Sequence, residues 1–109
     1  MERRHHLRVP TDIETLIYRS GLPVATGLIR NVSRCGVLLE TECLELHRHQ
    51  PLQFEFRLSG DGTVTRYRVA AYVLRRTGEG VGLEIDDADG GSTHAIGSLV
   101  DAHTVTALG

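Results

Sequence analysis

The sequence contains neither lysine nor tryptophan, and aromatic residues make up only 5% of its 109 residues. Its two cysteines, Cys35 and Cys43, have neither CxxC spacing nor the density of a secreted disulfide framework, so we expect two reduced thiols. No apolar run approaches the roughly 18 residues that cross a bilayer, and the charged N-terminus is unlike a signal peptide. These absences predict a cytoplasmic protein without membrane insertion.

The overall charge does not favour binding to a nucleic acid polymer. The formal net charge is -2 at pH 7, and few aromatic side chains are present to stack on bases. A barrel of the OB or Sm-like kind that binds single-stranded nucleic acid is therefore poorly supported. All 12 basic residues are arginines, and an exposed arginine offers a planar fork of donors that fits a phosphate or a guanine edge. Any anion site should be local.

Six short segments carry the patterns of β-strands, and turns rich in glycine separate several of them. The clearest, PLQFEFRL, alternates apolar and polar residues at the period of a half-buried strand. The segments span residues 13–18, 24–32, 36–40, 51–58, 64–76 and 81–85. Short strands without intervening helices predict an all-β fold, a small six-stranded antiparallel barrel that leaves no exposed sheet edge. Its expected core includes Phe54, Phe56, Val69 and Leu83.

The C-terminal segment, from Gly90 onward, has a helical pattern instead. Its apolar residues Ile96, Leu99 and Val100 share one face at helical spacing. Ser92 or Thr93 is expected to cap the helix. We therefore expect one C-terminal α-helix packed against the barrel.

The first ten residues, MERRHHLRVP, concentrate positive charge ahead of any segment that could be buried. Arg3, Arg4 and Arg8 have no apolar stripe beside them, and Pro10 disfavours a helix. We expect a flexible N-terminal arm over residues 1–10 and a barrel with its helix over residues 11–109, in a single domain overall. Such an arm could wrap an anion, because a guanidinium pairs bidentately with phosphate oxygens or with the edge of guanine.

A second polar motif stands in the segment NVSRCG, residues 31–36. Asn31 and Ser33 stand two apart on one side of a strand end, where an amide and a hydroxyl can reach the same planar ligand. Gly36 could permit a positive φ or let a flat base approach the backbone. Taken alone, the motif describes an ordinary polar turn equally well.

Together, RHHLR at residues 4–8 and NVSRCG at residues 31–36 resemble the signature of the PilZ domain family, RxxxR followed by (D/N)xSxxG, with every signature position filled. The flanking segments at residues 2–4 and 8–10, and GVGLEI at residues 80–85, are also similar. The likeness covers roughly residues 2–87, and the tail matches the family's C-terminal helix only loosely. It implies a PilZ-type barrel with a receptor site for the bacterial second messenger cyclic di-GMP.

The resemblance also assigns roles to individual side chains. The implied ligand-binding residues are Arg3, Arg4, Arg8, Asn31, Ser33 and Gly36. In that assignment the second and third arginines contact phosphates and guanine edges, the asparagine and serine bond the guanine edge, and the glycine leaves room for the ligand. Arg3 matches family members that bind two intercalated ligand molecules, which implies a cyclic di-GMP dimer. Asn31 is the neutral option at its position, so we expect somewhat lower affinity than with a carboxylate.

The sequence gives no sign of catalysis or of a metal site. No nucleophile stands with a base and an orienting acid at a readable spacing, so we expect no enzyme. The six histidines lack partners at metal-ligand spacing. We interpret the chain as a single-domain adaptor switched by cyclic di-GMP, whose output lies in an unidentified effector protein and in processes such as motility or biofilm formation. The alternative is a PilZ-like protein-interaction module that does not bind nucleotide.

Overall fold

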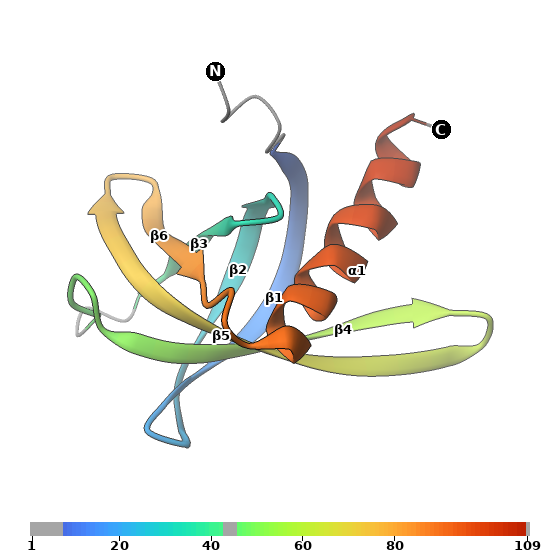
Figure 1. Ribbon diagram of the computed structural model, residues 1–109. Coiled ribbons are helices and arrows are strands. Elements are labelled where there is room, and N and C mark those ends of the chain that lie inside the picture. The colour runs from blue at the N-terminus through green and yellow to red at the C-terminus, as the bar shows by residue number, and fades with distance from the viewer. Residues whose placement is uncertain (1–7, 43–45, 109) are drawn as a thin grey trace.

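The computed structural model describes residues 8–42 and 46–108, with side chains to residue 104. Its elements are β1 (Val9–Arg19), β2 (Leu22–Val32), β3 (Gly36–Thr41), β4 (Pro51–Gly60), β5 (Thr63–Thr77), β6 (Gly80–Ile85) and α1 (Gly90–Leu108). Each strand pairs antiparallel with two neighbours, and the six strands close into a barrel in the order β1-β2-β3-β6-β5-β4, with α1 packed beside it (Figure 1). The predicted all-β fold, a six-stranded antiparallel barrel with a C-terminal helix, is confirmed.

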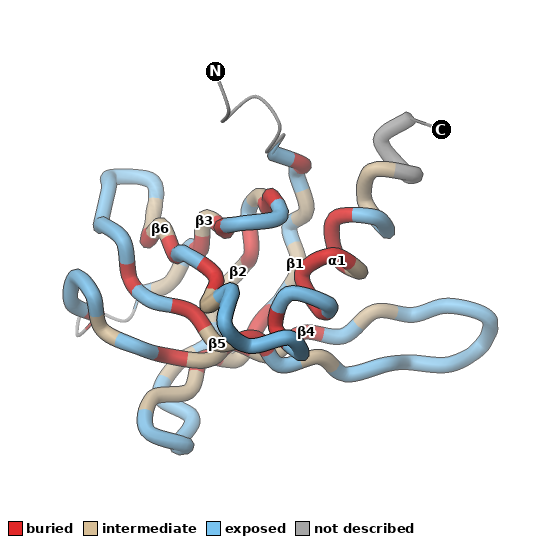
Figure 2. The backbone as a smooth tube through the Cα atoms, in the orientation of Figure 1, coloured by how far each residue is buried: buried red, intermediate tan, exposed pale blue. Residues whose placement is uncertain are grey.

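The core fills the barrel interior, because alternate residues of each strand point inward. The four residues predicted for it, Phe54, Phe56, Val69 and Leu83, are all at most 2% exposed. The first half of α1 adds apolar side chains to the same cluster, and Figure 2 shows its buried stretch next to the strands. Within the described residues, no helix combines the length and the apolar character needed to span a membrane.

The start of β1 lies inside the segment that the sequence assigned to the arm. Val9 pairs with Val32 and is buried, and Pro10 pairs with Asn31. A proline is tolerated there because, among the described residues, β1 has a strand partner on only one side at this end. Residues 1–7 of the predicted arm lie outside the described residues.

The helix α1 begins earlier than the sequence suggested. Asp89 holds the N-cap position, and its carbonyl oxygen accepts hydrogen bonds from the backbone N–H groups of Ser92 and Thr93 at 3.0 and 3.1 Å. The predicted cap at Ser92 or Thr93 is therefore wrong. The Ser92 hydroxyl is fully buried, donates to the Asp89 carboxylate and accepts from the Ala70 N–H at 2.7 Å, so it ties the helix to β5.

The pairing of β1 with β4, which closes the barrel, is short, and we call it the seam. Residues 16–18 of β1 pair with residues 53–55 of β4, whereas β4 pairs with β5 along its whole length. Beyond Leu16 and Glu55 the two strands diverge. In Figure 1 the β4–β5 ribbon extends to one side, β1 continues toward the N-terminus, and α1 lies between them.

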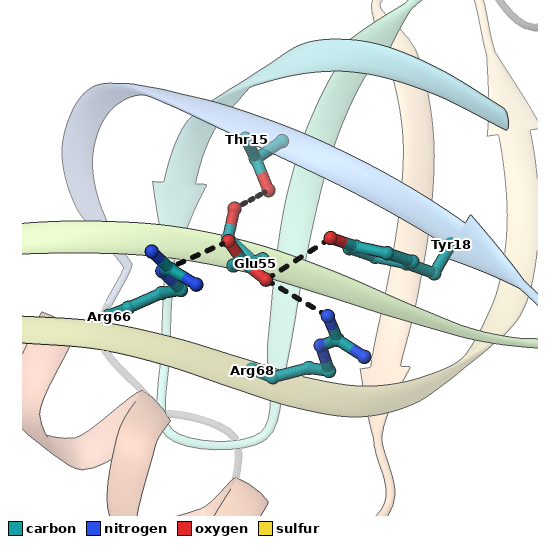
Figure 3. A network of polar contacts seen from close by, with 5 residues as sticks. All are labelled: Thr15, Tyr18, Glu55, Arg66 and Arg68. Atoms are coloured by element: carbon teal, nitrogen blue, oxygen red, sulfur yellow. Dashed lines mark hydrogen bonds and ion pairs between the residues drawn. The ribbon is translucent and has the colours of Figure 1, made fainter. Parts of the chain in front are cut away.

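Side chains reinforce the seam in a group that we call the Glu55 cluster, formed by Thr15, Tyr18, Glu55, Arg66 and Arg68 (Figure 3). The Thr15 hydroxyl donates to the Glu55 carbonyl oxygen at 2.7 Å, and the Tyr18 hydroxyl donates to Oε1 of the carboxylate at 3.3 Å. Arg68 Nη2 lies 3.1 Å from Oε1, and Arg66 Nε lies 3.5 Å from Oε2. The cluster thus joins β1, β4 and β5 where backbone pairing stops.

The Glu55 carboxylate is stabilised in its charged form. Its side chain is only 11% exposed, and burial alone would favour the neutral acid. The hydrogen bond from Arg68, the charge of Arg66 and the hydrogen bond from Tyr18 outweigh burial and lower the pKa of Glu55. The Arg68 guanidinium also lies 3.9 Å above the centre of the Tyr18 ring, a cation–π contact across the seam.

Candidate functional site

The part of the signature that the structure describes, Arg8 and residues 31–36, lies at one end of the barrel. Arg8 directly precedes β1, and the pairing of Pro10 with Asn31 brings it to the end of β2. The Arg8 Nη1 group donates to Asn31 Oδ1 at 2.7 Å, in an exposed position. The sequence placed both residues in one site, and they lie in contact.

Ser33 has a structural place within the turn between β2 and β3. Its side chain is 2% exposed. Its Oγ accepts from the Gly36 N–H at 3.2 Å and from the Cys35 N–H at 3.4 Å, and its hydroxyl lies 3.3 Å from the Gly36 carbonyl oxygen. The Ser33 N–H also donates to that carbonyl oxygen, at 2.8 Å. These bonds explain why a short polar side chain is needed at this position without any ligand.

Gly36 is required by a close approach of two strands. Its φ is not among the positive values, which belong to three other glycines and to four residues of other types. A Cβ on Gly36 would lie 2.8 Å from the carbonyl oxygen of Leu83 in β6, closer than real Cβ atoms come. It would also lie 3.7 Å from Arg8 Nη2, so the Arg8 guanidinium extends over the bare backbone of Gly36. Of the two alternatives from the sequence, the structure excludes the positive φ.

Arg34, inside the same turn, points to the helix. Its Nη2 lies 2.7 Å from Asp101 Oδ1, and its Nη1 lies 3.0 Å from where a Cβ of Gly97 would be. Both partners belong to α1. The turn that carries Asn31 and Gly36 is therefore in contact with the C-terminal helix through one exposed ion pair.

The outer face of the barrel continues the site across two further strands. Residues paired directly across a sheet share one face, and the pairings lead from Gly36 to Glu84 and then to Tyr72. The neighbouring row leads from Asn31 through Leu38 and Gly82 to Arg75. Strands lie about 4.8 Å apart, so these rows form a strip with glycines in its middle.

Sequence reasoning missed the far end of this strip. Tyr72 is 41% exposed, and the side chain of Arg75 lies 3.7 Å from where a Cβ of Gly82 would be. An exposed aromatic ring and an arginine are side chains that can bind a base and a phosphate. Only the pairing of β3 with β6 and of β6 with β5 reveals that they share a face with Gly36.

The electrostatics of the site favour an anion. Among the residues that the structure describes, no carboxylate lies within ion-pair distance of Arg8, whose partner Asn31 is neutral. Glu84 is the acidic residue paired with Gly36, and it is exposed. The charge of Arg8 is therefore not compensated by its neighbours.

Three further expectations from the sequence concern the N-terminal arginines, the two cysteines and metal binding. Arg3 and Arg4 lie outside the described residues, as does Cys43. Cys35 is an exposed free thiol in the turn. Over residues 8–42 and 46–104, histidine, cysteine and acidic side chains form no group of three or more that could hold a metal ion.

The chain is similar to known proteins in its sequence pattern and in its fold. The model of the PilZ domain family matches residues 2–102. No curated protein sequence matches the chain. Among solved structures, the Bacillus subtilis inhibitor of motility, MotI/DgrA, is similar with a TM-score of 0.74 at 18% sequence identity. That similarity covers 97% of this chain but 53% of the other, and it concerns the fold.

Proposed function

The chain belongs to the PilZ domain family, whose members bind cyclic di-GMP and interact with effector proteins, and on this premise we propose that it is a cyclic di-GMP receptor that acts as a single-domain adaptor. One observation carries the proposal. Arg8 and Asn31, which stand 23 positions apart in the chain, are in hydrogen-bond contact over the bare backbone of Gly36. The two halves of the signature thus form one surface.

The chemistry of this surface fits a cyclic dinucleotide. Arg8 can pair through its two terminal nitrogens with a phosphodiester or with the O6 and N7 edge of guanine. Asn31 accepts from Arg8 through Oδ1, which leaves its NH₂ group to donate to a guanine oxygen or nitrogen. Gly36 is buried between β6 and the Arg8 guanidinium, so its lack of a side chain lets Arg8 lie close to the strand. Ser33 acts as a positioning residue, because it holds the turn that presents the other two.

We assign Arg3, which precedes the signature, to a second ligand molecule, and Arg4 together with the rest of the arm to the switch. In this proposal Arg3 and Arg4 close over an intercalated cyclic di-GMP dimer, and the exposed strip toward Tyr72 and Arg75 gives the second molecule a surface. Ordering of the arm upon binding would create a surface that an effector protein recognises. Arm amides that exchange hydrogen equally fast with and without cyclic di-GMP would contradict the switch.

Calorimetric titration with cyclic di-GMP tests the proposal. We expect saturable binding of two ligand molecules per chain, and no binding of GTP or of a single-stranded oligonucleotide. Arg8→Ala should weaken binding by about fivefold to 150-fold, since a bidentate guanidinium contact contributes about 1–3 kcal/mol. Arg57→Ala is the matched control, because Arg57 is exposed and pairs with Arg66 in β5, away from the strip that ends at Tyr72 and Arg75.

The outcomes separate the components of the proposal. One bound molecule per chain would remove the dimer and leave the receptor intact. Equal losses in the Arg8 and Arg57 variants would show that charge alone is responsible. No binding at millimolar cyclic di-GMP would overturn the receptor and favour an interaction module that does not bind nucleotide.

A further inference from the structure

A groove lies on the outer face of the barrel next to the seam, and the proposed ligand site does not use it. It has a volume of about 1200 Å³, and its lining comes from β1, β2, β3, β4 and the residue that follows β3. We call it the seam groove. Its walls include the segments of β1 and β4 that flank the point where the two strands diverge.

The floor of the seam groove is apolar and its sides are acidic. Glu14 of β1 pairs with Leu28 of β2, which pairs with Glu40 of β3, so a leucine lies between two carboxylates on one face. One row along, Leu16 pairs with Glu55. Successive outward residues of a strand are about 6.8 Å apart. Along β1 the outward positions Glu14 and Leu16 follow one another, so an extended chain bound beside β1 would meet a carboxylate and then an apolar side chain at its own repeat.

The charge of the groove is predominantly negative. Five carboxylates and one arginine, Arg57, line it. Arg30 lies between two of the carboxylates, those of Asp12 and Glu40, and Glu55 is held by its own cluster. Glu14 and Glu42 are exposed, and no cationic side chain among the described residues pairs with either. A basic segment would supply the missing partners.

The groove also exposes strand edges. On the sides that face each other, β1 before Leu16 and β4 after Glu55 have no strand partner within the described part of the chain. Unpaired backbone N–H and C=O groups at such an edge can pair with an added strand. The Thr15 hydroxyl takes up the Glu55 carbonyl oxygen at the point of divergence. Beyond it α1 packs between the two strands, whereas the lining of the groove comes from the strands and Glu42, so an added strand would pair from the side of the groove.

We propose that the seam groove is a docking surface for an extended segment of a partner protein that alternates basic and apolar side chains. The segment adds a strand beside β1, with an apolar side chain on Leu16 and a basic side chain paired with Glu14, and its positive charge complements the acidic lining that includes Glu42. This surface is separate from the signature residues, so its test does not depend on cyclic di-GMP binding.

The probe for the test is a fluorescein-labelled octapeptide of alternating arginine and valine, followed by anisotropy and by amide NMR shifts of the full chain. Three reference peptides accompany it: one with glutamate in place of arginine, one with scrambled order, and one N-methylated at every second residue to block strand pairing. The variant Glu14→Gln/Glu42→Gln removes two charges from the groove. The matched control, Glu79→Gln/Asp87→Asn, removes two exposed charges near β6.

We expect the arginine peptide to shift amides of residues 12–16 and 55–60, and the N-methylated peptide to bind at least about fivefold more weakly. The groove variant should weaken binding by about fivefold to tenfold, and the control variant by less than about twofold, because surface ion pairs act locally. Equal losses in both variants, equal binding of the scrambled or N-methylated peptide, or no binding at all would overturn the proposal. So would shifts of the same amides upon deletion of residues 1–7, which would assign the groove to the chain's own arm.

Discussion

The barrel carries two arginine groups on its outer face, and they differ in what holds them. In the Glu55 cluster, two arginines share a carboxylate that is mostly buried and whose pKa is lowered. At the signature, Arg8 contacts the neutral amide of Asn31 in an exposed position. A guanidinium paired with a carboxylate has its charge compensated and joins elements of the fold. A guanidinium that is hydrogen-bonded to a neutral amide has no compensating charge beside it, so it can still pair with an anionic ligand.

The two arginine groups should therefore have different roles, which mutations can separate. The Glu55 cluster should contribute to stability and not to ligand binding. The signature should contribute to ligand binding. The shape of its surface should depend on the close approach of the β3 and β6 backbones more than on charge. The most informative substitutions are those that alter stability or ligand binding at one of the two regions.

Gly36→Ala should have the largest effect, because it tests whether the site is held by backbone packing. The new Cβ would lie 2.8 Å from the Leu83 carbonyl oxygen, and a backbone atom cannot move aside without shifting a strand. We expect the free energy of unfolding to fall by about 2 kcal/mol in urea denaturation. Gly60→Ala is the control, since no atom lies within 4 Å of its added Cβ. Equal stability of the two variants would contradict the packing argument.

Glu55→Ala should break the cluster at the seam and spare the site. Its removal leaves Arg66, Arg68 and the Tyr18 hydroxyl without their shared acceptor, and we expect a loss of about 1.5 kcal/mol because both arginines are partly exposed to solvent. Affinity for cyclic di-GMP, measured by titration, should stay within about twofold of the wild type. Glu79→Ala serves as the exposed control. A joint loss of stability and affinity would show that the two regions are coupled.

Asn31→Asp should make the signature resemble the Glu55 cluster, with a smaller effect. A carboxylate adds charge-assisted acceptor bonds to the N–H groups of guanine, so we expect affinity for cyclic di-GMP to rise by about fivefold. Calorimetry would measure it. Weaker binding would mean that the new carboxylate holds Arg8 as Glu55 holds Arg68, and the neutral amide would then be a requirement of this site.

The smallest expected effect is the pH dependence of the free energy of unfolding that arises from the Glu55 carboxylate. The hydrogen bond from Arg68 is the main cause that lowers its folded pKa, so the ionised form stabilises the fold. That contribution is complete above the unfolded pKa of about 4.3 and is lost as pH falls through the lower folded value. The difference in unfolding free energy between the wild type and Glu55→Gln should shrink by about 0.5 kcal/mol between about pH 5 and pH 3. A constant difference would mean that Glu55 acts through packing alone.

The sequence predicted those features that depend on local pattern. The alternation in the segment PLQFEFRL predicted β4, and glycine-containing turns separated its neighbours, so all six strands were found, although β1 begins at Val9, inside the predicted arm. The helix start was misplaced because the Ser92 hydroxyl bonds to the backbone of Ala70, a partner that no local pattern reveals.

The candidate site was predicted only as far as its motif extends. Arg8 and Asn31 were placed together by resemblance to a family, and the structure adds their contact. Tyr72 and Arg75 were missed because they join the site through two strand pairings that are distant in sequence. The Glu55 cluster was missed for the same reason, since its members come from three strands.

The short seam also has a kinetic consequence. Closing the barrel pairs Leu16 with Glu55, residues far apart in the chain, whereas the β1–β2, β4–β5 and β5–β6 hairpins form between neighbours. Closure of a long loop carries an entropic cost that favours its formation late in folding. Contacts made after the rate-limiting step slow unfolding without accelerating folding. The Glu55 cluster should therefore slow the unfolding of the closed barrel, whereas the hairpins should determine its folding rate.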